Sequence, residues 1–239
     1  MNKLYIHLPT LILIVLCFFS LITSCSKEDP GPLQPDERSY SIVDFDRVAI
    51  GEAFSVQISQ ANYFSIIANG DRRNLNDLVV TKNGNSLSIK YGNNRDHQHQ
   101  TYLKITMPVL HSGNFFDACD SRITGFYNLD AINLFYSDAS SGQIDLEGSS
   151  ANLTIADASH VFATGKMDNL DIDVSGSSVL NAFNTEATNA NVTASGSSEV
   201  DITVTQQLTI KARDASRILY KGTPSISQQT SDASVVQKN

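Results

Sequence analysis

The fold is decided by residues 151–180, which read ANLTIADASHVFATGKMDNLDIDVSGSSVL. An alternating apolar run leads into the window Asp157-Ala158-Ser159, and a second such run leads into Gly176-Ser177-Ser178. The serines that close the two windows are 19 residues apart. A short unit of strand and turn is therefore repeated, and it is too short to form a domain by itself.

The same window recurs through the second half of the chain. The seven windows are Cys119-Asp120-Ser121, Asp138-Ala139-Ser140, Asp157-Ala158-Ser159, Gly176-Ser177-Ser178, Gly196-Ser197-Ser198, Asp214-Ala215-Ser216 and Asp232-Ala233-Ser234. Their serines follow one another at steps of 19, 19, 19, 20, 18 and 18 residues. A period near 20 without an amphipathic helix predicts the coils of a β-solenoid. Asp and Gly share the first position of the window, and both tolerate a left-handed backbone, so we expect this position to mark a turn.

The residues before each window alternate between apolar and polar, as in a strand with one buried face. The apolar positions are Ile132, Leu134, Tyr136, Ala151, Leu153, Ile155, Leu170, Ile172, Val174, Ala190, Val192, Ala194, Leu208, Ile210 and Ala212. A second apolar column, two residues after each serine, contains Ile123, Val161, Leu180, Val200, Ile218 and Val236, and Gly142 interrupts it. Since paired strands lie about 4.8 Å apart, about seven coils would stack to roughly 30 Å.

The segment before the repeats is also rich in strand patterns. We expect strands over 40–48, 54–60, 63–68, 78–82, 86–91 and 102–107, with turns at Asn69-Gly70, Asn83-Gly84 and Gly92-Asn93-Asn94. The predicted fold class is an all-β, β-helix-like solenoid with coils of about 18–20 residues. Residues 38–239 are expected to form a single domain, with an irregular front part over 38–108 and regular repeats over 109–239.

The first residues of the chain indicate export. Lys3 precedes an apolar run over Leu11–Ile22, which is too short to span a bilayer and suits a secretory signal. The small residues before Cys25 resemble a bacterial lipobox, so residues 1–24 are predicted to be a lipoprotein signal peptide and Cys25 the lipid attachment site. An ordinary signal peptide and an uncleaved anchor are the alternatives. Residues 25–37 then read as a lipidated tether.

A short acidic run after Cys25 bears on the location. Ser26-Lys27-Glu28-Asp29 looks like an export tag for the outer face of the outer membrane, although such runs are also common in solvated linkers. The predicted location is therefore the outer membrane, lipid-anchored and exposed at the cell surface, with the periplasmic face as the alternative.

Charge and cysteine content narrow the partners. The chain carries a formal charge of −8, and loss of residues 1–24 removes one lysine and no acid, which leaves −9. Nucleic acid is therefore a poor partner. Without the signal peptide only Cys25 and Cys119 remain, so no internal disulfide accompanies a lipidated Cys25. Cys119 opens the first window, and we interpret it as a small turn residue rather than a nucleophile.

Three other groups of residues were candidates for chemistry. His97 and His99 could share one face of a strand as half a metal site, but their polar neighbours favour a solvated loop, and no metal is predicted. Outward carboxylates could serve a glycan-active enzyme or simply keep the solenoid soluble; they are Asp145, Glu147, Asp171, Asp173, Glu199 and Asp201. Outward aromatic residues could form a sugar-stacking platform or pack at the coil edges; they are Phe126, Phe135, Phe162 and Phe183.

Several segments together resemble a known family. They are Val48-Ala49-Ile50-Gly51-Glu52-Ala53-Phe54-Ser55-Val56-Gln57-Ile58, Asn83-Gly84 before Leu87-Ser88-Ile89, Ile105-Thr106-Met107-Pro108, and the Ser-Gly-Ser-Ser coils. The chain is similar over nearly all of residues 38–239 to the family described as "putative auto-transporter adhesin, head GIN domain". The resemblance implies a right-handed parallel β-helix-like envelope protein of adhesin type, and it implies no catalytic residues.

The functional hypothesis is a non-enzymatic, lipid-anchored cell-envelope protein whose β-solenoid presents a surface for adhesion or binding. No catalytic, cofactor-binding or metal site is predicted. The expected partners are the outer membrane, through the N-terminal lipid, and an unidentified glycan or a protein of the envelope or host. The alternatives are a glycan-active β-helix enzyme that uses outward carboxylates, and a purely structural envelope component.

Overall fold

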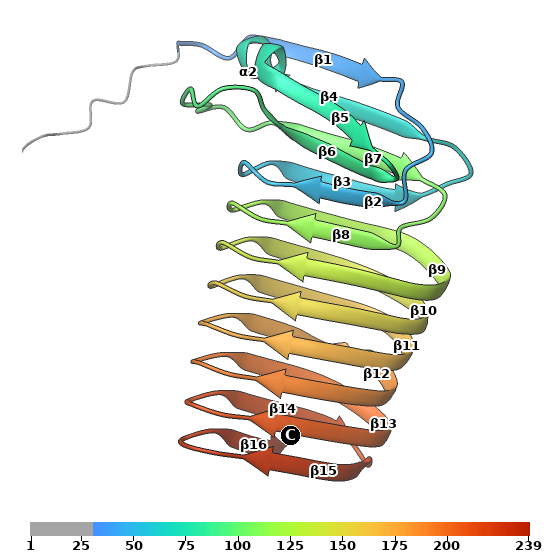
Figure 1. The fold of residues 1–239 in the computed structure, drawn as a ribbon, viewed down its shortest axis with the longest axis vertical. Helices are drawn as coiled ribbons and strands as arrows, with labels where there is room; N and C mark the ends of the chain where they lie inside the picture. The colour runs from blue at the N-terminus through green and yellow to red at the C-terminus, as the bar shows by residue number, and fades with distance from the viewer. Residues whose placement is uncertain (1–30) are drawn as a thin grey trace, which may run out of the picture. The chain divides into compact units, whose positions relative to one another are not determined.

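The computed structural model describes residues 31–239, and residues 34–239 form one compact, nearly all-β unit (Figure 1). The predicted signal peptide, Cys25 and the start of the tether lie outside the described residues. Within the described part, no helix is long and apolar enough to cross a membrane.

Seventeen elements make up the described chain. The front part contains β1 (Pro35–Tyr40), β2 (Arg47–Ile50), β3 (Ser55–Gln60), β4 (Ser65–Asp71), α2 (Arg72–Asp77), β5 (Leu78–Asn83), β6 (Ser86–Tyr91) and β7 (Tyr102–Met107). The coils contain β8 (Ser112–Phe115), β9 (Asp120–Tyr136), β10 (Ser141–Ile155), β11 (His160–Val174), β12 (Val179–Ala194), β13 (Glu199–Ala212), β14 (Arg217–Gly222), β15 (Ser225–Thr230) and β16 (Val235–Lys238). The predicted fold class is confirmed, with a β-solenoid of about seven turns.

Each coil consists of two extended runs that lie on opposite sides of the core. Face A is the outer surface of one set of runs, made of β1, β4, β7, β3, the first halves of β9 to β13, β14 and β16. Face B is the outer surface of β5, β6, β2, β8, the second halves of β9 to β13, and β15. The long strands bend from face A to face B at one edge of the body, and tight turns return the chain at the other edge (Figure 1).

The spatial order of the coils departs from their order in the sequence at the front. Strand β3 lies between β7 and β9, and β2 lies between β6 and β8, so residues 47–60 are inserted between two later coils. Beyond β6 and β7 the parallel pairing ends. There β4 pairs antiparallel with β7, β5 pairs antiparallel with β6, and β1 pairs antiparallel with β4. The helix α2 connects β4 to β5. These elements cap the N-terminal end of the solenoid.

The predicted inward columns form the core. All fifteen apolar positions before the windows are buried, and so are Ile123, Val161, Leu180, Val200 and Ile218, whereas Val236 in the last coil is partly buried. Successive side chains of a strand point to opposite faces, so a single correct register places all of these apolar side chains in the core.

The windows form the tight turns, as predicted. Asp138, Asp157, Asp214 and Asp232 have φ between 55° and 63°, and Gly176 and Gly196 have φ of 74°. Asp and Gly therefore alternate in one column because both reach the left-handed region at low cost.

The prediction for the first window is wrong by two residues. The pairing aligns Asp120 with Ser141 and Ser121 with Gly142, so Cys119 occupies the place of the buried serine. The first turn is Asp117-Ala118-Cys119, in which Asp117 and Ala118 have φ of 52° and 58°. The step from Cys119 to Ser140 is then longer than the others, because β9 contains extra residues at its bend.

The front part differs from the expectation at four places. Residues 41–46 form a loop rather than the middle of a strand, and Phe45 from this loop packs on Phe64 with ring centroids 4.9 Å apart. Asn69-Gly70 lies inside β4, because β4 continues to Asp71 and pairs with β1. Strand β1 starts at Pro35, within the range assigned to the tether, because it pairs with β4 from its first residue. The helix α2 was not expected.

Candidate functional site: a polar groove on face A

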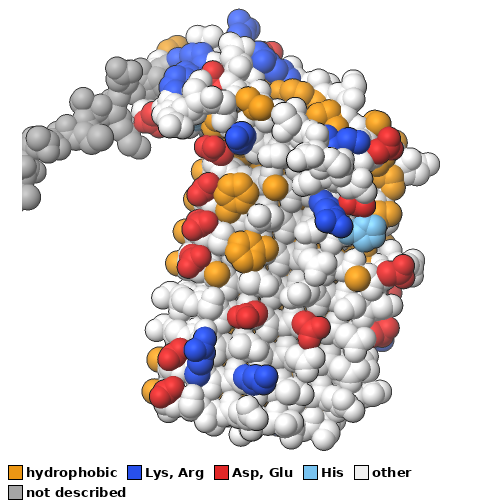
Figure 2. Space-filling model, viewed as in Figure 1, with side chains coloured by type: hydrophobic (Ala, Val, Ile, Leu, Met, Phe, Trp, Pro, Cys, Tyr) orange, Lys and Arg blue, Asp and Glu red, His pale blue; other side chains and the backbone are white. Residues whose placement is uncertain are grey.

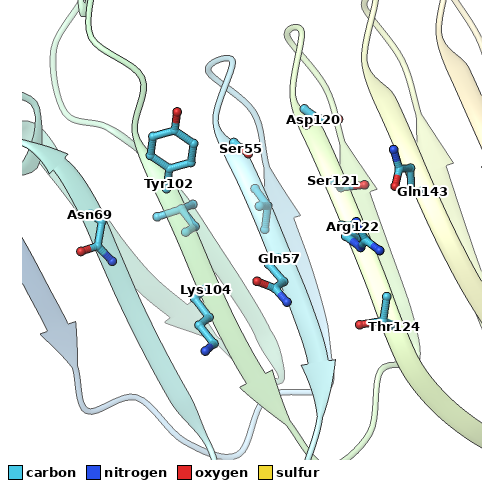
Figure 3. A pocket seen from close by; sticks show the side chains of 12 residues that line it. Ser55, Gln57, Asn69, Tyr102, Lys104, Asp120, Ser121, Arg122, Thr124 and Gln143 are labelled. Carbon is cyan, nitrogen blue, oxygen red and sulfur yellow. The ribbon is translucent and has the colours of Figure 1, made fainter.

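A groove of about 530 Å³ lies on face A, where the front part meets the first regular coils (Figure 3). Its lining comes from β4, β7, β3, β9 and β10, and most of the side chains are polar. They are Ser55, Gln57, Asn69, Tyr102, Lys104, Asp120, Arg122, Thr124 and Gln143, with Val56, Leu103 and Ser121 beneath them.

The strand register arranges these side chains in two rows across the strands. In the first row, Asn69, Tyr102, Ser55 and Asp120 are direct neighbours on β4, β7, β3 and β9. The side chain of Ser55 is the shortest in this row, so it forms a low floor between Tyr102 and Asp120. Alternate residues of a strand point to the same face, so the second row lies beside the first.

The second row carries the positive charge of the groove. Lys104, Gln57, Arg122 and Gln143 are direct neighbours on β7, β3, β9 and β10. Figure 3 shows Lys104, Gln57 and Arg122 in this order across three adjacent strands. Two strand spacings separate the Cα atoms of Lys104 and Arg122, or about 10 Å.

The two cations of the groove have no partner within residues 31–239: neither Lys104 nor Arg122 forms an ion pair or a side-chain hydrogen bond there. The acid of the groove, Asp120, accepts a hydrogen bond of 2.6 Å from the Ser141 hydroxyl. Tyr102 is 55% exposed, and its ring stands at the border of the groove. The groove thus combines two free cations, carboxamides, hydroxyls and one exposed aromatic ring.

Two smaller hollows continue the groove along face A. A hollow of about 280 Å³ shares Asp120 and Gln143 with the groove, and another of about 160 Å³ shares Arg122, Thr124 and Gln143. Phe162 on β11 lines both, next to Gln143 in the second row, and is 39% exposed. The three hollows form a shallow track that crosses the strands along the solenoid axis.

The two histidines considered as metal ligands lie apart from this groove and contact different carboxylates. The His97 ring stacks on Tyr91 with centroids 3.4 Å apart, and its Nε2 lies 3.0 Å from Asp77 Oδ2. The His99 Nε2 lies 3.8 Å from Asp71 Oδ2. The His97 side chain is thus packed, while residues 92–100 around it form the largely exposed loop that was predicted. Among residues 31–239, no group of three His, Cys, Asp or Glu side chains is placed to hold a metal ion.

Cys119 is buried in the turn column, where six coils have serine. Burial, with a smaller contribution from Asp120, raises the pKa of the Cys119 thiol to about 12. A thiolate is the reactive form of cysteine, so this thiol is unreactive at neutral pH.

The six outward carboxylates are divided between the two faces. Asp145, Glu199 and Asp201 belong to runs of face A, whereas Asp171 and Asp173 belong to face B and Glu147 lies near the bend. Several have a partner of their own: Asp171 accepts from Asn191 at 2.7 Å, Asp145 accepts from Thr164 at 3.2 Å, and Glu199 pairs with Arg217 at 3.0 Å. Glu199 and Asp201 stand two residues apart on β13, where burial and then the charge of Glu199 raise the pKa of Asp201. None of the six carboxylates lines the groove on face A.

The aromatic residues form no continuous platform. Phe126 was expected to point outward but is fully buried, because the bend of β9 reverses its facing. Phe135 and Phe162 are exposed on opposite faces, and Phe183 lies beneath the Lys221 ammonium, 4.0 Å from the ring centroid. Phe126 and Phe183 do not share a column, contrary to the count from the serines.

Sequence reasoning missed Tyr102, Lys104 and Arg122. Residues 102–107 were expected to form a strand, and the alternation of exposed Tyr102 and Lys104 with buried Leu103 was readable. The position of these residues beside β3 could not be read from the sequence, because it depends on the insertion of residues 47–60 between two later coils.

The chain matches the family described as "Putative auto-transporter adhesin, head GIN domain" over residues 44–224, which confirms the resemblance. No curated protein matched the sequence of this chain. A putative adhesin from Bacteroides fragilis NCTC 9343 has a TM-score of 0.81 at 17% identity, over 86% of this chain and 97% of that one. A putative adhesin from Parabacteroides merdae ATCC 43184 has a TM-score of 0.68 at 13% identity, over 86% and 96%. A putative lipid binding protein from Parabacteroides distasonis ATCC 8503 has a TM-score of 0.66 at 18% identity, over 86% and 96%. At such identities the likeness shows a shared fold.

Proposed function

Because this chain belongs to the family of putative auto-transporter adhesins with a head GIN domain, we propose that it is a non-enzymatic binding protein of the cell envelope. In this proposal the groove on face A holds the ligand and leaves it chemically unchanged. A lipid on Cys25 anchors the protein in the outer membrane, and the solenoid faces the cell exterior.

The observation that carries the proposal is the grid of polar side chains on face A. Strands on both sides of β3 hold these side chains at fixed spacing, and the two cations have no internal partner. A ligand that meets such a rigid surface loses little free energy to reorganisation of the protein. The outward carboxylates, by contrast, are scattered over two faces, which supports binding without catalysis.

A binding screen tests the proposal. The mature chain, with Ala in place of Cys25 so that it can be handled without lipid, is applied to a glycan array and to envelope extracts. We expect saturable binding of at least one ligand, and we expect Tyr102→Ala combined with Arg122→Ala to abolish it without changing the melting temperature. Tyr127→Ala, an exposed tyrosine outside the groove, is the matched control.

Two results would contradict the proposal. Release of new reducing ends from a bound glycan would indicate an enzyme. Binding that survives the double substitution would place the ligand elsewhere.

A further inference from the structure

The structure points to the chemical class of the ligand: we propose that the groove on face A binds an acidic oligosaccharide, with its carboxylate or sulfate group between Lys104 and Arg122. This inference rests on the proposed function and makes it specific.

The charge of the groove is opposite to that of the coils around it. Residues 111–239 contain 15 acidic and seven basic residues, yet the second row of the groove has Lys104 and Arg122 and no acid as far as β11. Binding of an external anion would lower the free energy of a cationic side chain that has no partner in an otherwise acidic protein. Arg in particular presents a planar fork that matches carboxylate and sulfate oxygens.

The space between the two cations is suited to one anionic group. Gln57 lies between Lys104 and Arg122, and both cationic side chains are long enough to reach toward a group above Gln57. The Gln57 carboxamide can donate a further hydrogen bond to the same group. A single carboxylate or sulfate at this point would therefore be held from three strands.

The rest of the lining suits the body of a sugar. Asn69, Ser55, Gln143 and Asp120 offer donors and acceptors for hydroxyl groups, and Tyr102 offers a flat ring for the C–H face of a pyranose. Lying on a sheet face rather than at a strand edge, the groove offers no backbone groups for a peptide strand.

The length of the track favours an oligomer over a single sugar. The hollows continue from β4 to β12, and within them Tyr102 on β7 and Phe162 on β11 lie four strand spacings apart, or roughly 19 Å. A linear chain could lie along the solenoid axis and contact both rings.

Calorimetric titration of the mature chain with defined oligosaccharides tests the inference. The probes are an oligogalacturonate, which carries carboxylates, its fully methyl-esterified form, which is neutral, and a sulfated galactan oligosaccharide, which carries sulfate alone. We expect an acidic probe to bind at least about tenfold more tightly than the neutral ester, and the affinity to fall as salt is added. The acidic probe that binds identifies carboxylate or sulfate as the group.

Substitutions locate the anion. Arg122→Gln and Lys104→Gln should each weaken the acidic probe by about tenfold and leave the neutral ester unchanged, whereas Tyr102→Ala should weaken both. Lys166→Gln, which removes an exposed lysine that pairs with Glu186 outside the groove, is the matched control.

The outcomes separate this inference from the proposed function. If the neutral ester and the acidic probe bind equally well, the ligand is not an acidic sugar, but the binding role remains. The same holds if an envelope protein is the sole ligand and the double variant no longer binds it. A ligand that is indifferent to Tyr102, Lys104 and Arg122 would overturn both.

Discussion

At the scale of the residue, a column of buried serines supports the tight turns. The hydroxyl oxygens of Ser140, Ser159 and Ser178 each accept a hydrogen bond of 3.2 Å from the backbone N–H of the residue one coil earlier. In later coils the direction changes, and the Ser216 hydroxyl donates to the Arg213 carbonyl at 2.8 Å. Serine suits this column because it is small and because its hydroxyl can donate or accept.

The small volume at the column is testable with one substitution. Ser178 is fully buried, so we expect Ser178→Leu to lower the free energy of unfolding by about 1–3 kcal/mol through overpacking. Asn181→Leu, on the outer side of β12, the strand that follows Ser178, should have a clearly smaller effect. Chemical denaturation measures both, and equal effects would show that the column is not tightly packed.

The left-handed turns predict an unusual gain from glycine. Ala158 has a φ of 65°, a region that disfavours any residue with a Cβ, whereas Ala215 at the same place in another coil does not have positive φ. Ala158→Gly should therefore raise the free energy of unfolding by about 1 kcal/mol. Ala215→Gly should lower it, because glycine loses more backbone entropy on folding. Thermal unfolding distinguishes the two, and a loss at both positions would contradict the assigned turn geometry.

At the scale of the element, neighbouring coils fit because large and small residues compensate for each other. Gly142 interrupts an apolar column, and the Tyr136 ring fills the space above it: a Cβ on Gly142 would lie 2.5 Å from that ring. Tyr136 also stacks on Phe115, with centroids 5.0 Å apart, and its hydroxyl bonds to the Ser121 hydroxyl at 2.8 Å. One tyrosine thus joins β8, β9 and β10.

A double-mutant cycle tests this compensation. Gly142→Ala should lower the free energy of unfolding by about 1–3 kcal/mol in the native chain, because the new methyl group overlaps the Tyr136 ring. In a Tyr136→Leu background the same change should cost much less. Denaturant titrations give the four free energies, and a cost that is independent of residue 136 would argue against the contact.

The capping helix α2 predicts a specific acid sensitivity. Asp71 is buried and accepts hydrogen bonds from the Arg73 side chain and from the backbone N–H groups of Arg73 and Gln34. The hydrogen bonds from the Arg73 side chain are the largest cause of a pKa well below the ordinary value of Asp71. Because the folded pKa is lowered, the carboxylate stabilises the fold at pH values above its ordinary range, and this stability is lost as the pH falls below about 4.

The measurement is the melting temperature as a function of pH, for the native chain and for Asp71→Asn. We expect the variant to be less stable at neutral pH by about 1–3 kcal/mol and to lose less stability between neutral pH and pH values below 4. Asp36→Asn, a substitution of a partly exposed acid on β1, is the control. Parallel pH curves for Asp71→Asn and the native chain would show that Asp71 contributes no acid sensitivity.

At the scale of the whole molecule, charge is unevenly distributed along the solenoid. Residues 34–110, which contain the cap, carry eight acidic and eight basic residues, whereas residues 111–239 carry an excess of eight acids. Figure 2 shows acidic side chains recurring along one edge of the coils, where the turn aspartates lie. An anionic membrane surface would therefore repel the coils more strongly than the cap.

The anchor itself is testable in cells. Cys25→Ala removes the thiol that would carry the lipid, so the protein should leave the membrane fraction and lose the mass of the lipid. Cys119→Ala, which changes a buried cysteine, should leave both properties unchanged. Membrane fractionation with mass spectrometry measures both, and continued membrane association of the Cys25 variant without a mass change would contradict lipidation.

The repeat by itself determined the architecture of the coils. The serine period, the alternation before it and the shared Asp and Gly position correctly placed the strands, the core and the turns from Ile132 to the last coil. These features are local, because each depends on residues within one coil and on the equivalent residues of the next. The first window was misplaced because Cys119-Asp120-Ser121 imitates the pattern by chance, and only the pairing of β9 with β10 revealed that Cys119 replaces the serine.

The groove was decided by the tertiary structure alone. The chain places β7 on one side of β3 and β9 on the other. The exposed residues of β7, Tyr102 and Lys104, therefore lie next to β3. On the other side of β3 lie Asp120 and Arg122 of β9. Strands pair through backbone groups that are the same in every residue, so sequence periodicity does not specify which strands of an irregular segment become neighbours. Packing of the complete body selects that order, and it is this order that brings two cations and an exposed tyrosine together on face A.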